Sequence, residues 1–199
     1  VKGALLARDT LDCDLVLLDD GFQHRRIHRD LDIVLISGDP ASDELLPLGR
    51  LREPAGSLQR ADIVIRTKGA GSGVLSAELV PCSLVDIRGR REDLLVLEGK
   101  NVLAVSGIAR PGHFTRMLEG LGARVEAMCF ADHHEFTGRD LEAIGKRASG
   151  KDLIVTTEKD LVRIDAPPLE EKWRALKVEM RIEGIQQIIG EIERIVEES

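Results

Sequence analysis

The sequence has no tyrosine, one tryptophan and only three cysteines. Cys13, Cys82 and Cys129 form an odd set without C-x-x-C spacing, which favours reduced thiols of a cytosolic protein over a disulfide framework or a zinc site. No apolar run approaches the roughly 18 residues of a membrane span, and no signal-peptide layout is present. Basic residues number 28 against 35 acidic ones, giving a net charge of -7. This balance argues against a general nucleic-acid binder, because phosphate backbones are held by clustered cations.

What is present is ordinary for a globular protein. The chain has 199 residues, 43% of them hydrophobic and 32% charged, which is enough to bury a core in one domain or two small ones. The chain opens on Val1, within a segment that is predicted to be helical over residues 2–8. We therefore expect it to be a portion of a longer protein.

Predicted strands and helices alternate along the chain. Short apolar runs bounded by turn residues predict buried strands of a parallel sheet, and apolar residues at helical spacing predict helices. The strands are expected at 15–18, 33–36, 63–65, 102–108, 125–130, 153–157 and 176–182, with 84–87 alternating like an exposed strand. The helices are expected at 57–60, 114–121, 139–148 and 185–196. The glycine-rich stretch 68–73 lacks the Gly-Lys-Ser/Thr ending of a phosphate loop and is interpreted as a flexible linker.

Two carboxylates, Asp19 and Asp20, follow the strand predicted at 15–18, and His24 comes shortly after them. Ligands of open parallel sheets bind beyond the carboxyl ends of the strands. An apolar strand that ends in Asp-Asp has the layout of a Walker B element, in which a carboxylate holds Mg²⁺ beside nucleotide phosphates. The alternatives are a turn-forming role for each Asp and a structural hydrogen bond for His24.

Two further polar groups are candidates for binding or catalysis. Arg52 and Glu53 lie in a loop between two prolines, where an arginine is well placed to bind phosphate bidentately, although an exposed arginine is usually only a solvated cation. The other group is Asp132-His133-His134. Adjacent imidazoles point in different directions, so we expect at most one to face a site, and a surface turn is an equal alternative. As zinc ligands they lack partners at a recognised spacing.

Five stretches, in order, resemble the tetraacyldisaccharide 4'-kinase family of lipid A biosynthesis. They are LDDGFQH at 18–24, LPLGRLREP at 46–54, SGIARP at 106–111, FADHHEFT at 130–137 and TEKD at 157–160. The resemblance extends from near residue 1 to about residue 180. It implies an α/β fold, with a P-loop NTPase-like (Rossmann-like) parallel-sheet remnant and a second, smaller α/β domain.

The resemblance also implies domain boundaries and an activity. Residues 1–78 would be the C-terminal part of the nucleotide-binding kinase domain, 79–97 a linker strand, 98–170 the smaller domain, and 171–199 a returning strand and C-terminal helix. The activity would be Mg²⁺-requiring transfer of the γ-phosphoryl group of ATP to the 4'-hydroxyl of tetraacyldisaccharide 1-phosphate. The place would be the cytoplasmic face of the bacterial inner membrane, which the full-length protein would contact peripherally.

Residue by residue, the resemblance assigns roles to the same candidates. Asp19 and Asp20 match the acidic pair beside the metal and phosphates, and Asp20 and His24 are catalytic candidates. Arg52 and Glu53 match active-site positions of the stretch at 46–54, the arginine loop, which binds substrate or phosphate. One of His133 and His134 matches the histidine that pairs with the catalytic-base aspartate. We favour His133 and keep both as catalytic candidates.

The family's P-loop, Gly-x-x-x-x-Gly-Lys-Ser/Thr, does not occur in the 199 residues. We therefore expect a C-terminal portion of a kinase that does not catalyse phosphoryl transfer by itself. Two alternatives stay open. A DHH-type metal-dependent phosphoesterase also has a strand that ends in Asp-His-His, and a non-catalytic binding module would retain only a lipid or partner surface.

Overall fold

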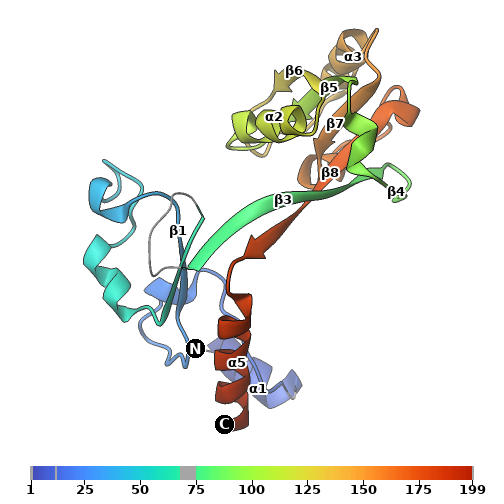
Figure 1. The fold of residues 1–199 in the computed structure, drawn as a ribbon. Helices are drawn as coiled ribbons and strands as arrows, with labels where there is room; N and C mark the ends of the chain where they lie inside the picture. The colour runs from blue at the N-terminus through green and yellow to red at the C-terminus, as the bar shows by residue number, and fades with distance from the viewer. Residues whose placement is uncertain (1, 12, 68–74, 199) are drawn as a thin grey trace. The chain divides into compact units, whose positions relative to one another are not determined.

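The computed structural model describes residues 2–11, 13–67 and 75–198. The linker expected at 68–73 therefore lies outside the described residues. The chain divides into two compact units (Figure 1). Unit 1 consists of Val1–Glu78 with Met180–Ser199, and unit 2 consists of Leu79–Glu179. Two strands, β3 (Leu75–Asp86) and β8 (Trp173–Ile182), pass from one unit into the other and are neighbours in the sheet.

Unit 1 is built on short parallel strands. It contains α1 (Lys2–Leu11), β1 (Ile33–Ile36), β2 (Ile63–Arg66), the start of β3 and α5 (Ile185–Glu198). β1 pairs in parallel with β2, and β2 pairs in parallel with the start of β3. The apolar stripe of α5 places Ile188 against Ile65 of β2 and Ala77 of β3, which form a small buried cluster. Three 3₁₀ helices, Gly21–Gln23, Pro40–Ser42 and Ala55–Arg60, lie in its loops.

Unit 2 has a parallel sheet covered by helices. The strands β5 (Asn101–Ser106), β6 (Arg124–Cys129) and β7 (Leu153–Thr157) pair in parallel in the order β6-β5-β7, and β7 pairs in parallel with β8. A two-residue strand, β4 (Arg91–Glu92), pairs antiparallel with β3. The helices are α2 (Pro111–Gly120), α3 (Gly138–Arg147) and the single turn α4 (Glu158–Leu161), with 3₁₀ helices at Leu94–Leu97 and Glu170–Lys172.

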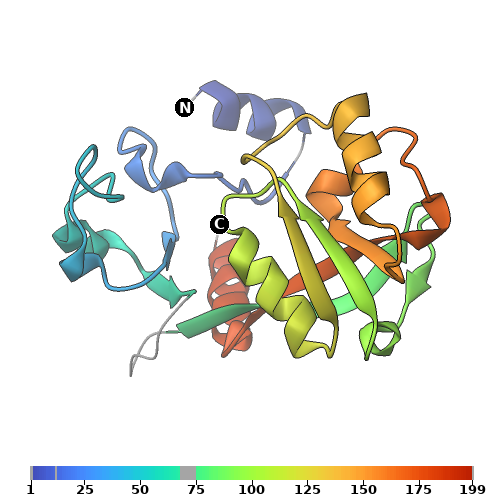
Figure 2. The same cartoon turned by 90° about the horizontal axis from the view of Figure 1, so that it is seen from above.

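The core of unit 2 lies on both faces of this sheet. Val102 and Ala104 of β5 pack with Phe114 and Leu118 of α2, whereas the alternate residues of β5 pack with the Ile144 side of α3. The two helices therefore cover opposite faces (Figure 2). Near-continuous burial along β5 and β7 explains why these strands are recognisable as apolar runs in the sequence.

The mixed α/β fold with a mostly parallel sheet confirms the expected fold class. The strands expected at 33–36, 63–65, 102–108, 125–130, 153–157 and 176–182 form as β1, β2, β5, β6, β7 and β8, with small shifts at their ends. The helices expected at 2–8, 57–60, 114–121, 139–148 and 185–196 also form, the second as a 3₁₀ helix. All three cysteines are free thiols. Within the described residues, no helix is long and apolar enough to cross a membrane.

The strand predicted at 15–18 is wrong. This segment has no regular secondary structure, and all four side chains are exposed, Leu17 by 82%. A strand needs a hydrogen-bonded neighbour to satisfy its backbone. Among the described residues, β1 at the end of the strand order pairs with β2, and no strand pairs with 15–18. An apolar run alone therefore did not produce a strand here.

Two predictions of burial are also wrong. β1 was expected to be buried on both faces, yet Leu35 is 56% exposed, because β1 occupies the edge of the sheet. Residues 84–87 were expected to be exposed, yet Leu84 and Asp86 are buried inside the longer strand β3. The buried carboxylate of Asp86 accepts hydrogen bonds from the backbone and side chain of Arg90, which compensate for its burial and lower its pKa.

Candidate functional site

The acidic pair of unit 1 sits in a tight turn. Asp20 has a left-handed backbone, with φ of 53°, and precedes the 3₁₀ helix Gly21–Gln23. The turn closes where the amide of His24 donates to the carbonyl of Gly21 at 2.9 Å. A Cβ on Gly21 would lie 2.7 Å from the Cβ of Leu18, so this position accommodates only glycine. Asp19 and Asp20 are both exposed at this turn.

The structure brings the acidic turn and the arginine loop together. Arg52 donates through Nη1 to Oδ2 of Asp20, joining two residues that are 32 positions apart. Both side chains are more than half exposed, so the ion pair contributes little stability by itself. The contact places an arginine and a carboxylate side by side in an open position. Both groups are therefore accessible to a ligand in solution.

A second connection between the same segments passes through Arg60. Its guanidinium donates to Glu53 and lies over the ring of Phe22, 4.4 Å from the ring centroid. Arg60 and Glu53 are each less than one-third exposed, so this contact is better shielded than the Asp20–Arg52 pair. Sequence reasoning missed Arg60, because its partners are distant in the sequence and only the fold brings them together.

The arginine loop has its own internal support. Leu46 and Leu51 are joined by a hydrogen bond from the amide of Leu46 to the carbonyl of Leu51 at 2.8 Å. Asp43 accepts a hydrogen bond from the backbone of Arg50 and from its Nε at 2.9 Å, and these contacts lower the pKa of Asp43. Arg50 is therefore tied to the base of its own loop, whereas Arg52 contacts the acidic turn.

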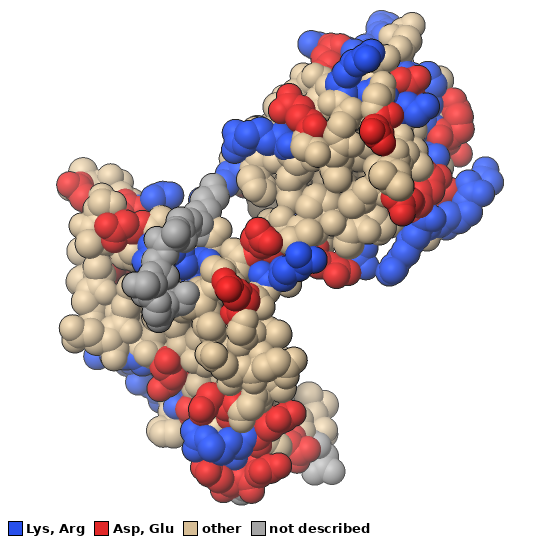
Figure 3. All heavy atoms as spheres, in the orientation of Figure 1, with Lys and Arg blue, Asp and Glu red and all other residues tan. Residues whose placement is uncertain are grey.

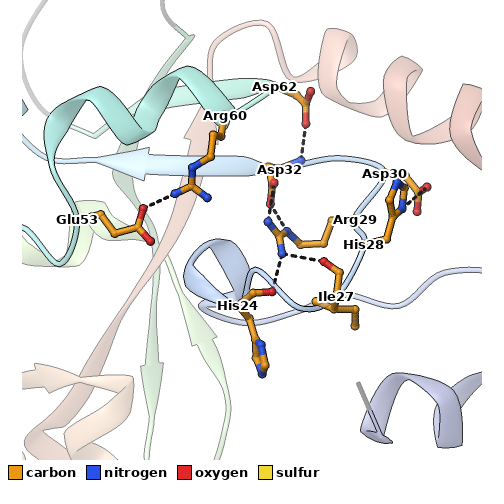
Figure 4. A network of polar contacts seen from close by, with 9 residues as sticks. All are labelled: His24, Ile27, His28, Arg29, Asp30, Asp32, Glu53, Arg60 and Asp62. Carbon is orange, nitrogen blue, oxygen red and sulfur yellow. Dashed lines mark hydrogen bonds and ion pairs between the residues drawn. The ribbon is translucent and has the colours of Figure 1, made fainter.

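Arg29 holds the segment that follows the acidic turn (Figure 4). Its guanidinium binds Asp32 bidentately, at 2.6 and 3.0 Å, and Nη1 donates to the carbonyls of His24 and Ile27 at 2.9 and 3.2 Å. This pairing raises the pKa of Arg29. Asp62 in turn accepts the backbone amide of Asp32 at 2.8 Å. The backbone of His24 is therefore fixed, while its ring points away from Arg29 (Figure 4).

In unit 2, three of the motif stretches meet at one edge of the sheet. They follow the carboxyl ends of β5, β6 and β7, which are adjacent and parallel. The amide of Phe130 donates to Ser106 at 2.8 Å, and the amide of His133 donates to the carbonyl of Gly107 at 3.1 Å. The amide of Gly107 donates to Oδ2 of the buried Asp160 at 3.0 Å. These bonds connect the SGIARP, FADHHEFT and TEKD stretches directly.

His134 is held in a packed environment. Its ring stacks on Phe130 with centroids 4.7 Å apart and meets the edge of Phe136 at 5.2 Å. Its Nε2 lies 3.1 Å from Oδ2 of Asp140. Asp140 also forms a capping box with Thr137 at the start of α3. Hydrogen bonds from the side chain and backbone of Thr137, and then from His134, lower the pKa of Asp140 to about 2.

His133 is exposed, in contrast to its neighbour. Its side chain is 76% exposed, and its backbone is left-handed, with φ of 59°. Nδ1 lies 3.2 Å from Nη2 of Arg163, and Nε2 lies 4.0 Å from Oδ1 of Asp132. The ring of His133 is therefore accessible to a ligand, whereas the ring of His134 already has its partners.

These motif stretches and this geometry agree with one family. The model of the family described as tetraacyldisaccharide-1-P 4'-kinase matches residues 1–196. The chain belongs to this family. The resemblance noted in the sequence is thereby confirmed.

Two relatives within this family share more than one-third of their aligned residues with the chain. The tetraacyldisaccharide 4'-kinase of Anaeromyxobacter sp. (strain K) is 40% identical over 187 residues, covering 82% of this chain and 50% of the relative. That of Syntrophus aciditrophicus (strain SB) is 37% identical, covering 88% of this chain and 56% of the relative. The chain thus spans about half the length of these curated relatives.

A crystal structure of LpxK from Aquifex aeolicus, described as an "apo" form in complex with ATP, has a similar fold. The TM-score is 0.71 at 32% identity, and the match covers 98% of this chain and 62% of that chain. The α/β fold described above is therefore the fold of this family.

The carboxylates of the acidic turn fit a magnesium ion that is held jointly with phosphates. Within the described parts of the chain, no group of three His, Cys, Asp or Glu residues could hold a metal ion. Mg²⁺, however, is commonly bound through one or two carboxylates with water and substrate phosphates supplying the remaining ligands. Asp19 and Asp20 are adjacent and exposed, which suits that kind of shared site.

Proposed function

We propose that this chain forms part of a lipid A 4'-kinase. The reaction is transfer of the γ-phosphoryl group of ATP to the 4'-hydroxyl of tetraacyldisaccharide 1-phosphate, at the cytoplasmic face of the bacterial inner membrane. Family membership supports the proposal, and so does ATP in the LpxK crystal structure from Aquifex aeolicus. The single observation that carries it is the contact of Arg52 with Asp20, which brings a cation beside the acidic turn.

In unit 1, the residues of the acidic turn and of the arginine loop have different proposed roles. Asp19 and Asp20 would hold Mg²⁺, which would neutralise charge on the phosphates when bound. Arg52 is exposed and planar, so it binds phosphate oxygens bidentately while Asp20 orients it. Glu53 fixes the loop through Arg60, and the Arg29 network fixes the backbone that carries His24. We propose that these contacts keep Arg52 and His24 in place before the nucleotide binds.

In unit 2, we propose that His133 is the histidine of the reaction. Its ring is exposed, whereas His134 has an aromatic neighbour on each side and a carboxylate on Nε2. An imidazole at the edge of the active site orients the carboxylate that accepts the sugar hydroxyl proton. His134 is instead held by its contacts with Phe130, Phe136 and Asp140.

A chimera tests the proposal. This chain replaces the matched half of the Anaeromyxobacter relative, so that the unmatched half of the relative supplies the P-loop. We expect ATP-dependent phosphorylation of tetraacyldisaccharide 1-phosphate by the chimera and none by the 199-residue chain alone. Arg52→Ala should lower kcat/KM by about 100-fold or more, in the range for loss of a charge-stabilising group.

Arg50→Ala is the matched control, because Arg50 lies in the same loop but pairs with Asp43. It should leave the rate within about twofold of the unsubstituted chimera, since an exposed ion pair contributes little. A folded chimera without activity would contradict the proposal. Mn²⁺-dependent hydrolysis of small phosphodiesters by the chain alone would instead support a DHH-type phosphoesterase.

A further inference from the structure

Asp160, the last residue of the TEKD stretch, is a fully buried carboxylate. Its Oδ2 accepts hydrogen bonds from the amide of Gly107 at 3.0 Å and from the hydroxyl of Thr157 at 2.9 Å. Its Oδ1 is also buried and has no hydrogen-bond partner among the described residues. The cation beside Oδ1 is Arg163, whose Nη1 lies 3.9 Å away. A buried carboxylate is costly unless it is compensated, so Asp160 holds this cation close.

Arg163 connects the buried carboxylate to the exposed histidine. While Nη1 faces Asp160, Nη2 lies 3.2 Å from Nδ1 of His133. The backbone of His133 is tied to the same place, because its amide donates to the carbonyl of Gly107. A Cβ on Gly107 would lie 3.3 Å from Oδ1 of Asp160, so Gly107 leaves room for this arrangement. Asp160 therefore contacts both supports of His133, the loop at Gly107 and the guanidinium of Arg163.

This geometry fixes which nitrogen of His133 carries the proton. An arginine side chain is always charged and has only donors, so Nδ1 of His133 must accept the hydrogen bond. In the neutral imidazole the proton is then on Nε2, which becomes the donor. Nε2 is 4.0 Å from Asp132, beyond hydrogen-bond distance, so this N–H is available to a ligand or a carboxylate.

We propose that Asp160 and Arg163 are positioning residues that hold His133 as the Nε2–H tautomer and aim its ring. The importance of this tautomer for catalysis rests on the proposed function. Asp160 is fully buried and cannot touch a substrate, so it acts through Arg163. It gives the TEKD stretch a role within the unit 2 site, which neither fold nor burial alone assigns.

Nitrogen-15 NMR of the imidazole rings in the 199-residue chain tests the tautomer directly. The chain has five histidines, and the signals of His133 are those lost in His133→Gln. At about pH 8, where an ordinary imidazole is neutral, we expect an unprotonated Nδ1 and a protonated Nε2. In Arg163→Glu the new carboxylate can only accept, so the proton should move to Nδ1. Arg163→Lys restores a donor and should restore the Nε2–H tautomer.

Arg147→Glu is the matched charge reversal, because Arg147 lies in unit 2 and pairs with Glu126 instead. It should leave the His133 signals unchanged. Asp160→Asn should move the Nδ1 signal toward the average of the two tautomers. If this buried substitution prevents folding, the Arg163 variants decide, since Arg163 is one-third exposed. An Nε2–H tautomer that persists in Arg163→Glu would overturn the proposal.

The NMR measurement needs no nucleotide, so its result is independent of whether the kinase function holds. In the active chimera, Arg163→Glu should lower kcat by about tenfold or more with little change in the KM for ATP, as for a disturbed acid–base group. A tautomer that switches with no change in kcat would overturn the catalytic meaning alone. An inactive chimera would contradict the proposed function and leave the NMR result standing.

Discussion

At the scale of single residues, the two adjacent histidines have opposite surroundings. His134 packs against Phe130 and Phe136 and contacts Asp140, whereas His133 is largely exposed. We expect His134→Ala to lower the free energy of unfolding by about 1–3 kcal/mol, because it removes aromatic contacts and a hydrogen bond. His133→Ala should change it by less than about 0.5 kcal/mol. Urea denaturation of both variants measures the difference between the two losses. Equal losses would contradict a packed His134 beside an exposed His133.

Asp140 gives the stability of unit 2 a defined pH dependence. Its pKa falls to about 2 in the folded chain, chiefly through hydrogen bonds from Thr137, against an ordinary value of 3.8. A lowered folded pKa means that the unfolded chain binds the proton more readily. The stabilisation is therefore complete above about pH 4 and is lost as pH falls toward 2.

Asp140→Asn tests this dependence when the free energies of unfolding of the variant and of the unsubstituted chain are measured by urea denaturation at several acidic pH values. The variant should be less stable than the unsubstituted chain at neutral pH, and the difference should shrink as pH falls from about 4 to about 2. Asp152→Asn is a useful comparison, because hydrogen bonds from Asn101 lower the pKa of Asp152 by the same kind of contact away from the histidines. A stability difference for Asp140→Asn that is constant over this range would rule out the carboxylate as its source.

At the scale of elements, the turn after β5 depends on a glycine at 107. A Cβ there would lie 3.2 Å from the Cβ of His134 and 3.3 Å from both the carbonyl of Ala131 and Oδ1 of Asp160. Gly107→Ala should therefore destabilise the chain by about 1–3 kcal/mol, as overpacking does. Gly120→Ala in α2 is the control, since nothing lies within 4 Å and a helical alanine stabilises by about 0.5–1 kcal/mol. Thermal unfolding of the two variants should shift in opposite directions.

The elements that could be predicted from the sequence are those whose burial or ends leave a pattern in their own residues. β7 is buried along nearly its whole length, so its sequence is an apolar run. The start of α3 is marked in the sequence by Thr137, the residue that forms its capping box. The segment 15–18 shows the limit of this reasoning. Its apolar run is as clear as that of β7, but strand formation depends on a neighbour that its own residues cannot specify.

The candidate site divides in the same way. Asp20 and Arg52 could be named as candidates from the sequence because their residue types and motif surroundings point to phosphate chemistry, and the structure shows that they are in contact. Arg60 and Arg163 could not, because each acts between partners that only the fold brings together. Resemblance to the family identified the stretches, and the structure supplied the contacts between them.

At the scale of the whole molecule, charges of both signs are mixed on the face drawn in Figure 3, where Lys and Arg side chains lie among Asp and Glu. The two units differ instead in their cores. Among the described residues, the buried hydrophobic side chains of unit 1 are Ile65, Ala77 and Ile188, and all the others belong to unit 2.

This difference predicts that the two units open separately. Burial of apolar surface is the main stabilising contribution, so unit 1 should unfold at several kcal/mol lower free energy than unit 2. Native-state hydrogen exchange should show amides of β2 exchanging at least about 100-fold faster, after correction for intrinsic rates, than those of β5. Equal protection in the two strands would mean that the units unfold as one cooperative body.

Substitutions in α5 test whether the core of unit 1 controls the opening of that unit. Ile188 is buried against β2 and β3, whereas Ile189 on the same helix is 38% exposed. Ile188→Ala should cost about 2–4 kcal/mol and speed exchange in β2, while Ile189→Ala costs less than about 1 kcal/mol. Neither should change exchange in β5, because the core of unit 2 does not include α5. Faster exchange in β5 on Ile188→Ala would show that the small core stabilises both units.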